Sequence, residues 1–191
     1  MTLLEIMQSV LQQQGKTTDA QVVHEWRDKY TQLVNEGLID LAGALKLRRT
    51  DVVAIPDSRI LNIENGIPDT DNPEKHHACL KILGIRQGGR FVQYGRGPST
   101  YEIRVGTTGA VEIEYRYLPA ALSNETDEPG IPERLHPLLV NYVLGKDITT
   151  NDVTTQQRAG QFYQLYEAGK LQAQRMYGEP EFYGIRNKWE I

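Results

Sequence analysis

The first 45 residues carry apolar side chains at helical spacing in two stretches. In the first stretch the apolar positions fall on one face and comprise Leu3, Met7, Val10 and Leu11. Thr2 and Glu5 have the spacing of a capping box, in which each side chain binds the other residue's backbone amide. Gly15 suits the position that follows a helix end. The pattern predicts a first helix from Leu3 to Gln14.

A second, longer helix is predicted to begin near Asp19. Thr18 and Gln21 repeat the capping-box spacing at its start. The apolar stripe that follows comprises Val23, Trp26, Tyr30, Leu33, Val34, Leu38, Leu41 and Leu45. Gly37 lies inside this stripe, where glycine costs about 1 kcal/mol relative to alanine. We therefore expect Gly37 to mark a close crossing between two helices.

From residue 47 to 118 the apolar period shortens and turn residues interrupt the chain. The candidate strands are Asp51–Ile55, Ile60–Ile63, Ala78–Arg86, Arg90–Tyr94, Tyr101–Val105 and Ala110–Tyr117. In the last of them, apolar Val111, Ile113 and Tyr115 alternate with charged residues, as in an antiparallel sheet with one solvated face. The Gly88-Gly89 pair is typical of a hairpin turn. Residues 65–74 are predicted to form a loop.

Two further helices are predicted after the connector formed by residues 118–130. Pro137 cannot lie deep inside a helix, so the third helix is expected to begin near His136, and Gly145 can end it. The fourth is expected to begin at residues 151–155 and to end near Gly178, with Pro180 beyond it. Its apolar positions are Ala159, Phe162, Leu165, Tyr166, Gly169, Ala173 and Met176.

The segment after residue 178 is short but rich in apolar side chains. It contains Phe182, Tyr183, Ile185, Trp189 and Ile191. Exposed apolar clusters promote association, so these side chains require a covering surface. The segment either folds back over the last helix of its own chain or serves as a docking arm for a neighbouring subunit or partner. Aromatic residues and arginine, such as Arg186, are the anchors that protein interfaces favour.

The order of elements predicts an α+β fold. Two N-terminal and two C-terminal helices form a bundle, a β-rich antiparallel lobe is inserted between the pairs, and an extended tail follows. The expected division is residues 1–46 for the first helical pair, 47–118 for the β-rich lobe, 119–177 for the second helical pair, and 178–191 for the C-terminal docking tail.

Composition narrows the function classes. The chain has 191 residues, of which 39% are hydrophobic and 24% charged, values typical of a globular protein. The net charge of −4 argues against a general nucleic-acid coat, which is usually basic. Cys79 is the single cysteine, so an intrachain disulfide is excluded. The N-terminus lacks the features of a signal peptide, and no apolar run approaches the roughly 20 residues of a membrane span.

Candidate metal and phosphate sites have a simpler explanation in each case. His76, His77 and Cys79 match no standard zinc spacing. Asp69, Asp71 and Glu74 lack the spacing of a calcium-binding loop and are expected to be solvated. The glycines between residues 84 and 97 are followed by strands instead of the helix that a phosphate-binding loop requires. The pattern therefore predicts no metal and no cofactor.

Catalytic residues are not indicated either. Ser58, Ser99 and Ser123 lack the G-x-S-x-G setting of a hydrolase nucleophile. His24 is expected to face solvent, and His136 is a candidate for a helix cap. We therefore predict a binding and assembly function without a catalytic site.

The segment Val111–Tyr142 resembles the head-to-tail adaptor, or tail-completion, proteins of tailed bacteriophages. The matching residues are Tyr115, Arg116, Pro119, Leu122, Ser123, Asp127, Pro132, His136, Leu139, Val140 and Tyr142. The N-terminal half, with Trp26, Leu33 and Glu36, is similar to the opening helices of that family.

The resemblance implies a structural virion protein in the neck, assembled in the host cytoplasm. Subunits of that family are monomeric when free and form a ring, commonly of twelve, beneath the portal protein, with tail or nozzle proteins below. DNA passes through the ring without sequence readout, and no membrane is involved. The C-terminal tail docks on the portal, which assigns a portal contact to Phe182, Tyr183, Ile185, Arg186 and Trp189. The alternatives are another neck or tail-terminator component, or a small hydrolase.

Overall fold

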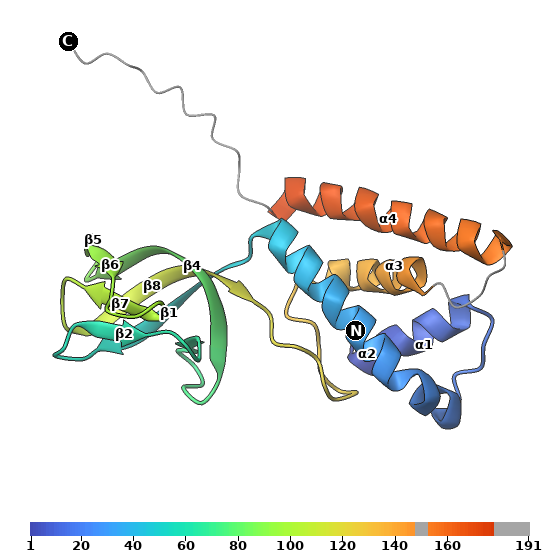
Figure 1. Cartoon of the computed structure of the whole chain (residues 1–191), viewed down its shortest axis with the longest axis horizontal. Coiled ribbons are helices and arrows are strands. Elements are labelled where there is room, and N and C mark those ends of the chain that lie inside the picture. Colours follow the sequence, from blue (N-terminus) through green and yellow to red (C-terminus); the bar gives the residue numbers. More distant parts are fainter. Residues whose placement is uncertain (148–152, 178–191) are drawn as a thin grey trace, which may run out of the picture.

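The computed structural model describes residues 1–147 and 153–177, which contain four α-helices and one 3-10 helix. The helices are α1 (Leu3–Gln13), α2 (Ala20–Leu45), η1 (Glu133–Leu135), α3 (His136–Lys146) and α4 (Val153–Tyr177). The strands are β1 (Arg48–Ile55), β2 (Ile60–Asn62), β3 (Ile67–Pro68), β4 (His76–Gln87), β5 (Arg90–Phe91), β6 (Tyr94–Arg96), β7 (Glu102–Val105) and β8 (Gly109–Leu118). The predicted α+β fold is confirmed: a helical bundle lies beside antiparallel sheets (Figure 1).

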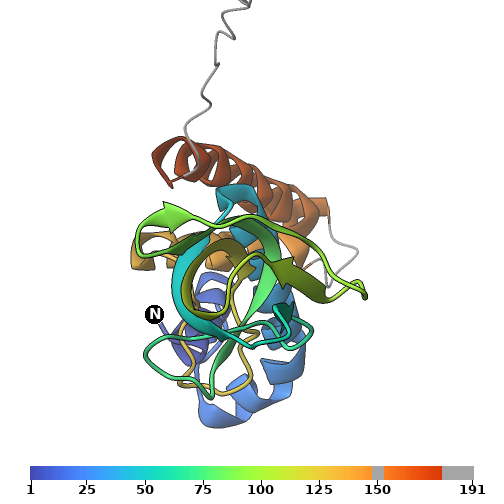
Figure 2. The same ribbon diagram turned by 90° about the vertical axis from the view of Figure 1, so that its left-hand side faces the viewer.

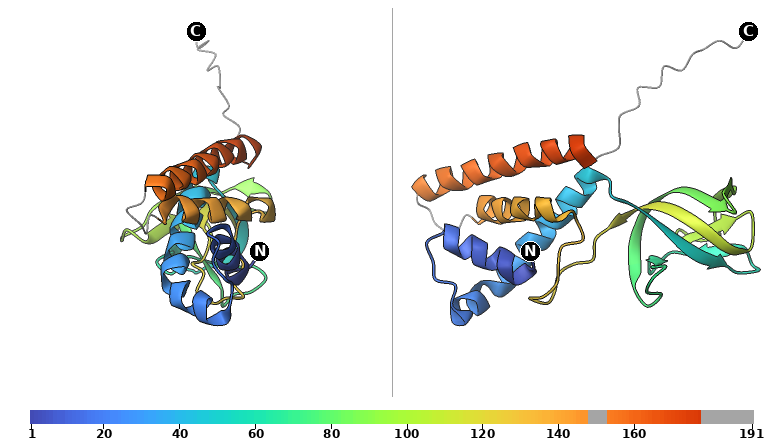
Figure 3. Two further views of the ribbon diagram at one scale, coloured as in Figure 1. Left: turned by 90° about the vertical axis from the view of Figure 1, so that its right-hand side faces the viewer. Right: turned by 180° about the vertical axis from the view of Figure 1, so that it is seen from behind.

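The helices pack around one apolar core, which joins the two ends of the sequence. α3 packs against α1, α2 and α4, so it lies at the centre of this helical region (Figure 3). The fully buried side chains of this core include Leu3, Leu11, Leu38, Leu139 and Val143. Burying a leucine or valine side chain contributes about 1.5–3 kcal/mol. The amphipathic stripes therefore account for the association of the N-terminal and C-terminal pairs.

The strands form a β region with its own apolar core. One sheet has the order β1-β8-β4-β3, with β5 paired to β4, and a second has the order β2-β7-β6. Figure 2 shows this region end-on, with the strands curving around their common core. The alternation predicted for β8 is confirmed, because Val111, Ile113 and Tyr115 are buried there. That the helical and β regions are separate folding units stays a prediction.

Two adjacent chain segments connect the regions. Lys46 ends α2 in the left-handed conformation, and β1 begins at Arg48. β8 runs antiparallel to β1 in register, and the Tyr117 amide donates to the Leu47 carbonyl at 3.2 Å. The pairing of β1 with β8 therefore extends to the point where both segments leave the helical region.

Local signals at the helix ends were partly correct. The Thr2–Glu5 capping box is present, and Gly15 has a φ of +74° just past α1. The capping box predicted for Thr18 is wrong, because Asp19 occupies the cap position of α2 and makes no side-chain capping bond. α3 begins at His136 as predicted.

Three other expectations about these elements are corrected by the structure. Segment 65–74 contains the short strand β3, and the Arg90–Tyr94 strand is broken into β5 and β6. Gly145 does not end α3, which continues to Lys146. Leu165 and Met176 belong to no core and are 57% and 58% exposed. α4 buries Ala159, Tyr166 and Ala173 along one side, and Leu165 and Met176 lie off that side.

Two glycines permit close helix crossings. A Cβ atom on Gly37 would lie 2.8 Å from the ring of Tyr142, which confirms the expected crossing of α2 with α3. A Cβ atom on Gly145 would lie 2.9 Å from the Tyr163 backbone on α4. Glycine at residue 145 is thus explained by helix packing, since a backbone cannot move aside as a flexible side chain can.

Replacing Gly145 with alanine is expected to destabilise the helical region. The added methyl group forces α3 and α4 apart, and overpacking of this kind costs about 1–3 kcal/mol. Urea unfolding followed by circular dichroism measures the change. Gly160→Ala is the matched control, because nothing lies within 4 Å of its Cβ position. That variant is expected to gain up to about 1 kcal/mol from helix propensity. Equal stability of the two variants would contradict the packing explanation.

Candidate interaction surfaces

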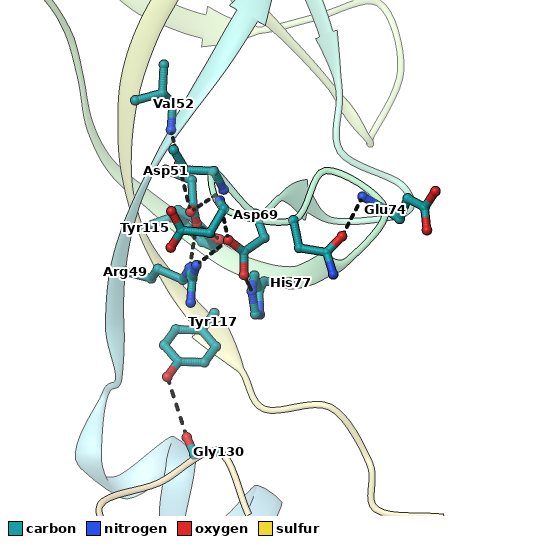
Figure 4. A network of polar contacts seen from close by, with 12 residues as sticks. Arg49, Asp51, Val52, Asp69, Glu74, His77, Tyr115, Tyr117 and Gly130 are labelled. Atoms are coloured by element: carbon teal, nitrogen blue, oxygen red, sulfur yellow. Dashed lines mark hydrogen bonds and ion pairs between the residues drawn. The ribbon is translucent and has the colours of Figure 1, made fainter.

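A buried polar network lies at the end of the β region nearest the helices (Figure 4). Its centre is Asp51 on β1, whose side chain is 1% exposed. The Arg49 guanidinium donates to Asp51 at 2.7 Å and the Tyr115 hydroxyl donates at 2.7 Å. The Thr70 backbone amide donates to Asp51 at 3.0 Å, and the Thr70 hydroxyl donates to Asp51 at 3.1 Å. Burial raises the pKa of the Asp51 carboxyl, but these hydrogen bonds together outweigh burial and lower that pKa to about 2.

The same network holds the segment between β3 and β4. Arg49 forms a second ion pair with Asp69 at 2.8 Å, and His77 Nε2 lies 3.1 Å from the other Asp69 oxygen. The hydrogen bond with His77 lowers the pKa of the Asp69 carboxyl. The expectation that Asp69 is solvated is therefore wrong, because Asp69 and His77 are both buried and bind each other.

A second network fixes the end of α3 to α1 and α2. Asp147 is 3% exposed and accepts hydrogen bonds from Lys29, from Tyr30 at 3.0 Å and from Gln14 at 2.7 Å. Burial raises the pKa of the Asp147 carboxyl, yet these donors outweigh burial and lower it. His136 is likewise buried, and its ring contacts the Met1 amine and the Ile131 carbonyl. His136 is therefore a core residue, whereas His24 is exposed as predicted.

Sequence reasoning missed both networks, although one signal was available. Asp51 occupies the same inward face of β1 as Val53 and Ile55, and a carboxylate at an inward position needs buried partners. No comparable signal marks Asp147, whose partners come from distant parts of the sequence.

Both networks hold chain segments together by hydrogen bonds that are already satisfied. Within the described ranges 1–147 and 153–177, no group of three histidine, cysteine, aspartate or glutamate residues is arranged to hold a metal ion. The Cys79 thiol is half-buried, and burial raises its pKa to about 11, so it is protonated near neutral pH. The networks therefore serve architecture.

The surface, in contrast, carries large apolar side chains without cover in this structure. On α4 these are Leu165, Leu171 and Met176, all more than half exposed. α4 forms the outer layer of the helical region, with α3 beneath it (Figure 1). On the β region the exposed apolar residues are Val52, Leu80, Phe91, Tyr94 and Tyr101. Both regions therefore carry exposed large apolar side chains that a partner could cover.

The residues predicted for portal docking lie outside the described residues. They are Phe182, Tyr183, Ile185, Arg186 and Trp189. The last described residue is Tyr177 at the end of α4, and the Arg134 guanidinium lies over its ring at 5.2 Å from the centroid.

None of the helices in the described part of the chain combines the length and apolarity needed to cross a membrane. A family model described as SU10 adaptor protein matches residues 1–181. No curated protein matches the chain.

Proposed function

The chain belongs to the SU10 adaptor protein family, and on this premise we propose that it is a subunit of the ring that joins a phage head to its tail beneath the portal. The observation that carries this proposal is the extent of the family match. It spans residues 1–181 and so includes both the helical region and the β region. Adaptors work by binding, and the satisfied polar networks of this chain are consistent with a structural protein without catalysis.

The open side of α4 supports assembly through the helical region. Leu165 and Met176 are more than half exposed on the same side of α4, and the buried side of the helix is packed on α3. Apolar side chains on an exposed helix face gain free energy when a second subunit covers them, at about 25 cal/mol per Å² of apolar surface. We propose that a neighbouring copy of the chain covers this side of α4 in the ring, which commonly has twelve subunits, and that the free chain is a monomer.

The remaining partners follow from the place of an adaptor in the virion neck. We propose that the portal protein binds the C-terminal residues, with Phe182, Tyr183, Ile185 and Trp189 as apolar anchors and Arg186 as a charged contact. Tail or nozzle proteins bind on the side of the ring that faces away from the portal, and assembly takes place in the host cytoplasm. DNA passes through the channel without sequence readout, since the net charge of −4 offers phosphates little general attraction.

Assembly on a purified portal tests this function. We expect the chain to be a monomer alone and to form a closed ring when portal is added, as measured by native mass spectrometry. Leu165→Glu is expected to lower ring yield by about tenfold, because it places an unpaired charge in a desolvated contact. Gln21→Glu at the start of α2 is the control, since it adds the same charge to an exposed position, and the α2–α4 hydrogen bonds lie at the other end of α2, at Asp40 and Ala44. A wild-type chain that ignores the portal, or a particle map that places it elsewhere in the neck, refutes the proposal.

A further inference from the structure

A groove of about 700 Å³ runs along the β region between β4 and β6. Cys79, Leu80, Lys81 and Ile82 line one wall, and residues 94–100 line the other. We call this groove the β4–β6 seam. The Tyr94 hydroxyl reaches across it to the Ile82 carbonyl at 3.3 Å. The two sheets of the β region therefore face each other here across a gap.

The β6 wall presents unpaired backbone groups to the seam. Gly97 donates to the Glu102 carbonyl, and Gly106 donates to the Gln93 carbonyl, so Gln93 and Gly97 face β7. Because backbone groups alternate between the two edges of a strand, the amides and carbonyls of Tyr94 and Arg96 face the other way. Among the described strands, only β7 pairs with β6.

The β4 wall is an irregular strand edge, because its register with β8 shifts between Cys79 and Lys81 and again between Ile82 and Gly84. On this edge β4 pairs with β3 at residues 76–77 and with β5 at residues 86–87. In the described structure no strand pairs with this edge between those two points. His77 faces β3 in this ladder, so the backbone of Cys79, two residues further on, faces the seam.

Apolar side chains line the space between the two edges. Ile63, Ile82 and Ile103 line the groove, and Ile82 and Ile103 belong to or pack on the core of the β region. Leu80 and Tyr94 stand at its rim, 55% and 42% exposed. An occupant with side chains on alternate sides of an extended backbone would place one apolar row on this floor.

The charge on the rim is positive. Lys81 and Arg96 stand on opposite walls, and neither forms an ion pair within residues 1–147 and 153–177. Glu102 also lines the groove and accepts a hydrogen bond from the Ser99 amide at 3.1 Å, so two cations and one carboxylate leave the lining with a formal charge of +1. An occupant with acidic side chains between its apolar residues matches this rim.

We propose that the β4–β6 seam binds an extended segment of a tail-side virion protein, which adds as a β-strand between β4 and β6 through alternating apolar and acidic residues. The tail-side identity rests on the proposed function, which gives the portal to the C-terminal residues. Backbone hydrogen bonds to the outward groups of β6 and to Cys79 on β4 supply affinity, and the apolar floor and basic rim select the sequence. The Ile82 carbonyl of β4 already accepts from the Tyr94 hydroxyl.

A blocked peptide in which valine alternates with threonine and glutamate is the probe, used with the full-length chain. We expect it to bind and to slow the reaction of Cys79, the single cysteine, with a thiol reagent at mildly alkaline pH. A version methylated on alternate backbone nitrogens is expected to bind at least tenfold more weakly. Replacing its glutamates with lysine is expected to weaken binding about threefold to tenfold.

Two substitutions of Arg96 separate backbone pairing from charge. Arg96→Ala removes only the charge, whereas Arg96→Pro also removes the amide that faces the seam. Proline is tolerated on an edge strand where its nitrogen faces away from the ladder, so both variants are expected to fold. We expect Arg96→Pro to bind the probe about fivefold more weakly than Arg96→Ala, the effect of one backbone hydrogen bond. Equal binding by the two variants, or an unprotected Cys79, overturns strand addition.

Two further outcomes distinguish the possible failures. If a peptide of residues 181–191 binds the seam more tightly than the acidic probe, the occupant is a second copy of the chain, and the tail-side assignment is wrong. Arg96→Pro is expected to assemble on the portal normally and to lose attachment of the tail. If the wild-type chain fails to assemble on the portal while the peptide still binds, the proposed function fails and strand addition stands.

Discussion

A chain that ends at Tyr177 is expected to fold normally and to lose attachment to the portal. Among the described residues the buried cores run from Leu3 to Ala173, so we expect the shortened chain to retain this packing. It also removes every side chain that we propose as an anchor for the portal. Loss of a central aromatic anchor alone costs 2 kcal/mol or more, and loss of the whole segment is expected to reduce infectious particles by several orders of magnitude.

Complementation of a phage that lacks the gene measures this effect, and thermal unfolding of the purified chain checks the fold. Replacing Phe182, Tyr183, Ile185 and Trp189 with serine in the full-length chain is the matched control. It keeps the length of the segment and is expected to reproduce the defect, whereas Arg186→Ala is expected to cause a smaller one. A truncated chain that still completes infectious particles would refute the role of the segment.

Replacing Asp51 with alanine is expected to destabilise the β region by about 3 kcal/mol. The substitution leaves Arg49, Tyr115 and Thr70 without their shared acceptor, and breaking a buried ion pair by removing one partner costs about 3–5 kcal/mol. The value expected here lies at the lower end because Arg49 keeps its ion pair with Asp69. Urea unfolding measures the loss, and Asp57→Ala, at an exposed turn, is expected to stay within about 0.5 kcal/mol of the wild type.

Acid pH is expected to lower the stability of the wild-type protein, because protonation removes the charge of Asp51. The pKa of Asp51 is lowered from 3.8 to about 2 in the folded state. A lowered folded-state pKa gives stability that is complete above pH 3.8 and is lost as pH falls through about 2. The shift corresponds to about 2 kcal/mol at 1.36 kcal/mol per unit.

Asp51→Asn cannot titrate and is expected to show a smaller loss of stability over the same pH range. Asp69, Asp147 and Asp40 also have lowered pKa values, so the variant keeps part of the acid sensitivity. The difference between the two proteins in stability lost at acid pH measures the contribution of Asp51. Parallel pH profiles for the wild type and the variant would show that Asp51 does not couple protonation to folding.

Periodicity in the sequence was sufficient to predict the helices and most of the strands. The stripes of α1 and α2 and the alternation in β8 repeat over many residues, so packing reinforces each local preference. β3 has two residues, and its pairing depends on contacts with β4 that no local pattern encodes. Leu165 and Met176 share the helical spacing of buried Tyr166 and Ala173 but are exposed, because spacing identifies apolar positions without identifying what covers them.

The interaction surfaces were less accessible to sequence reasoning. The apolar cluster after residue 178 can be recognised in the sequence, because a short terminal segment rich in apolar side chains is enough to predict a docking role. The β4–β6 seam arises from the opposition of two strand edges, and its lining residues come from segments up to about 40 positions apart. Which edges remain unpaired depends on the order of strands in both sheets, and a single sequence does not specify that order.

The two adjacent connections between the regions limit how the β region can swing. A single linking segment permits rotation about its own backbone torsions, so the body at its end can twist freely. Here β1 and β8 enter side by side and are hydrogen-bonded up to Leu47 and Tyr117. Twisting would have to break that ladder, whereas bending across it would not. The connection therefore lets the β region bend toward or away from the helical region while its rotation about the direction of the two strands stays fixed.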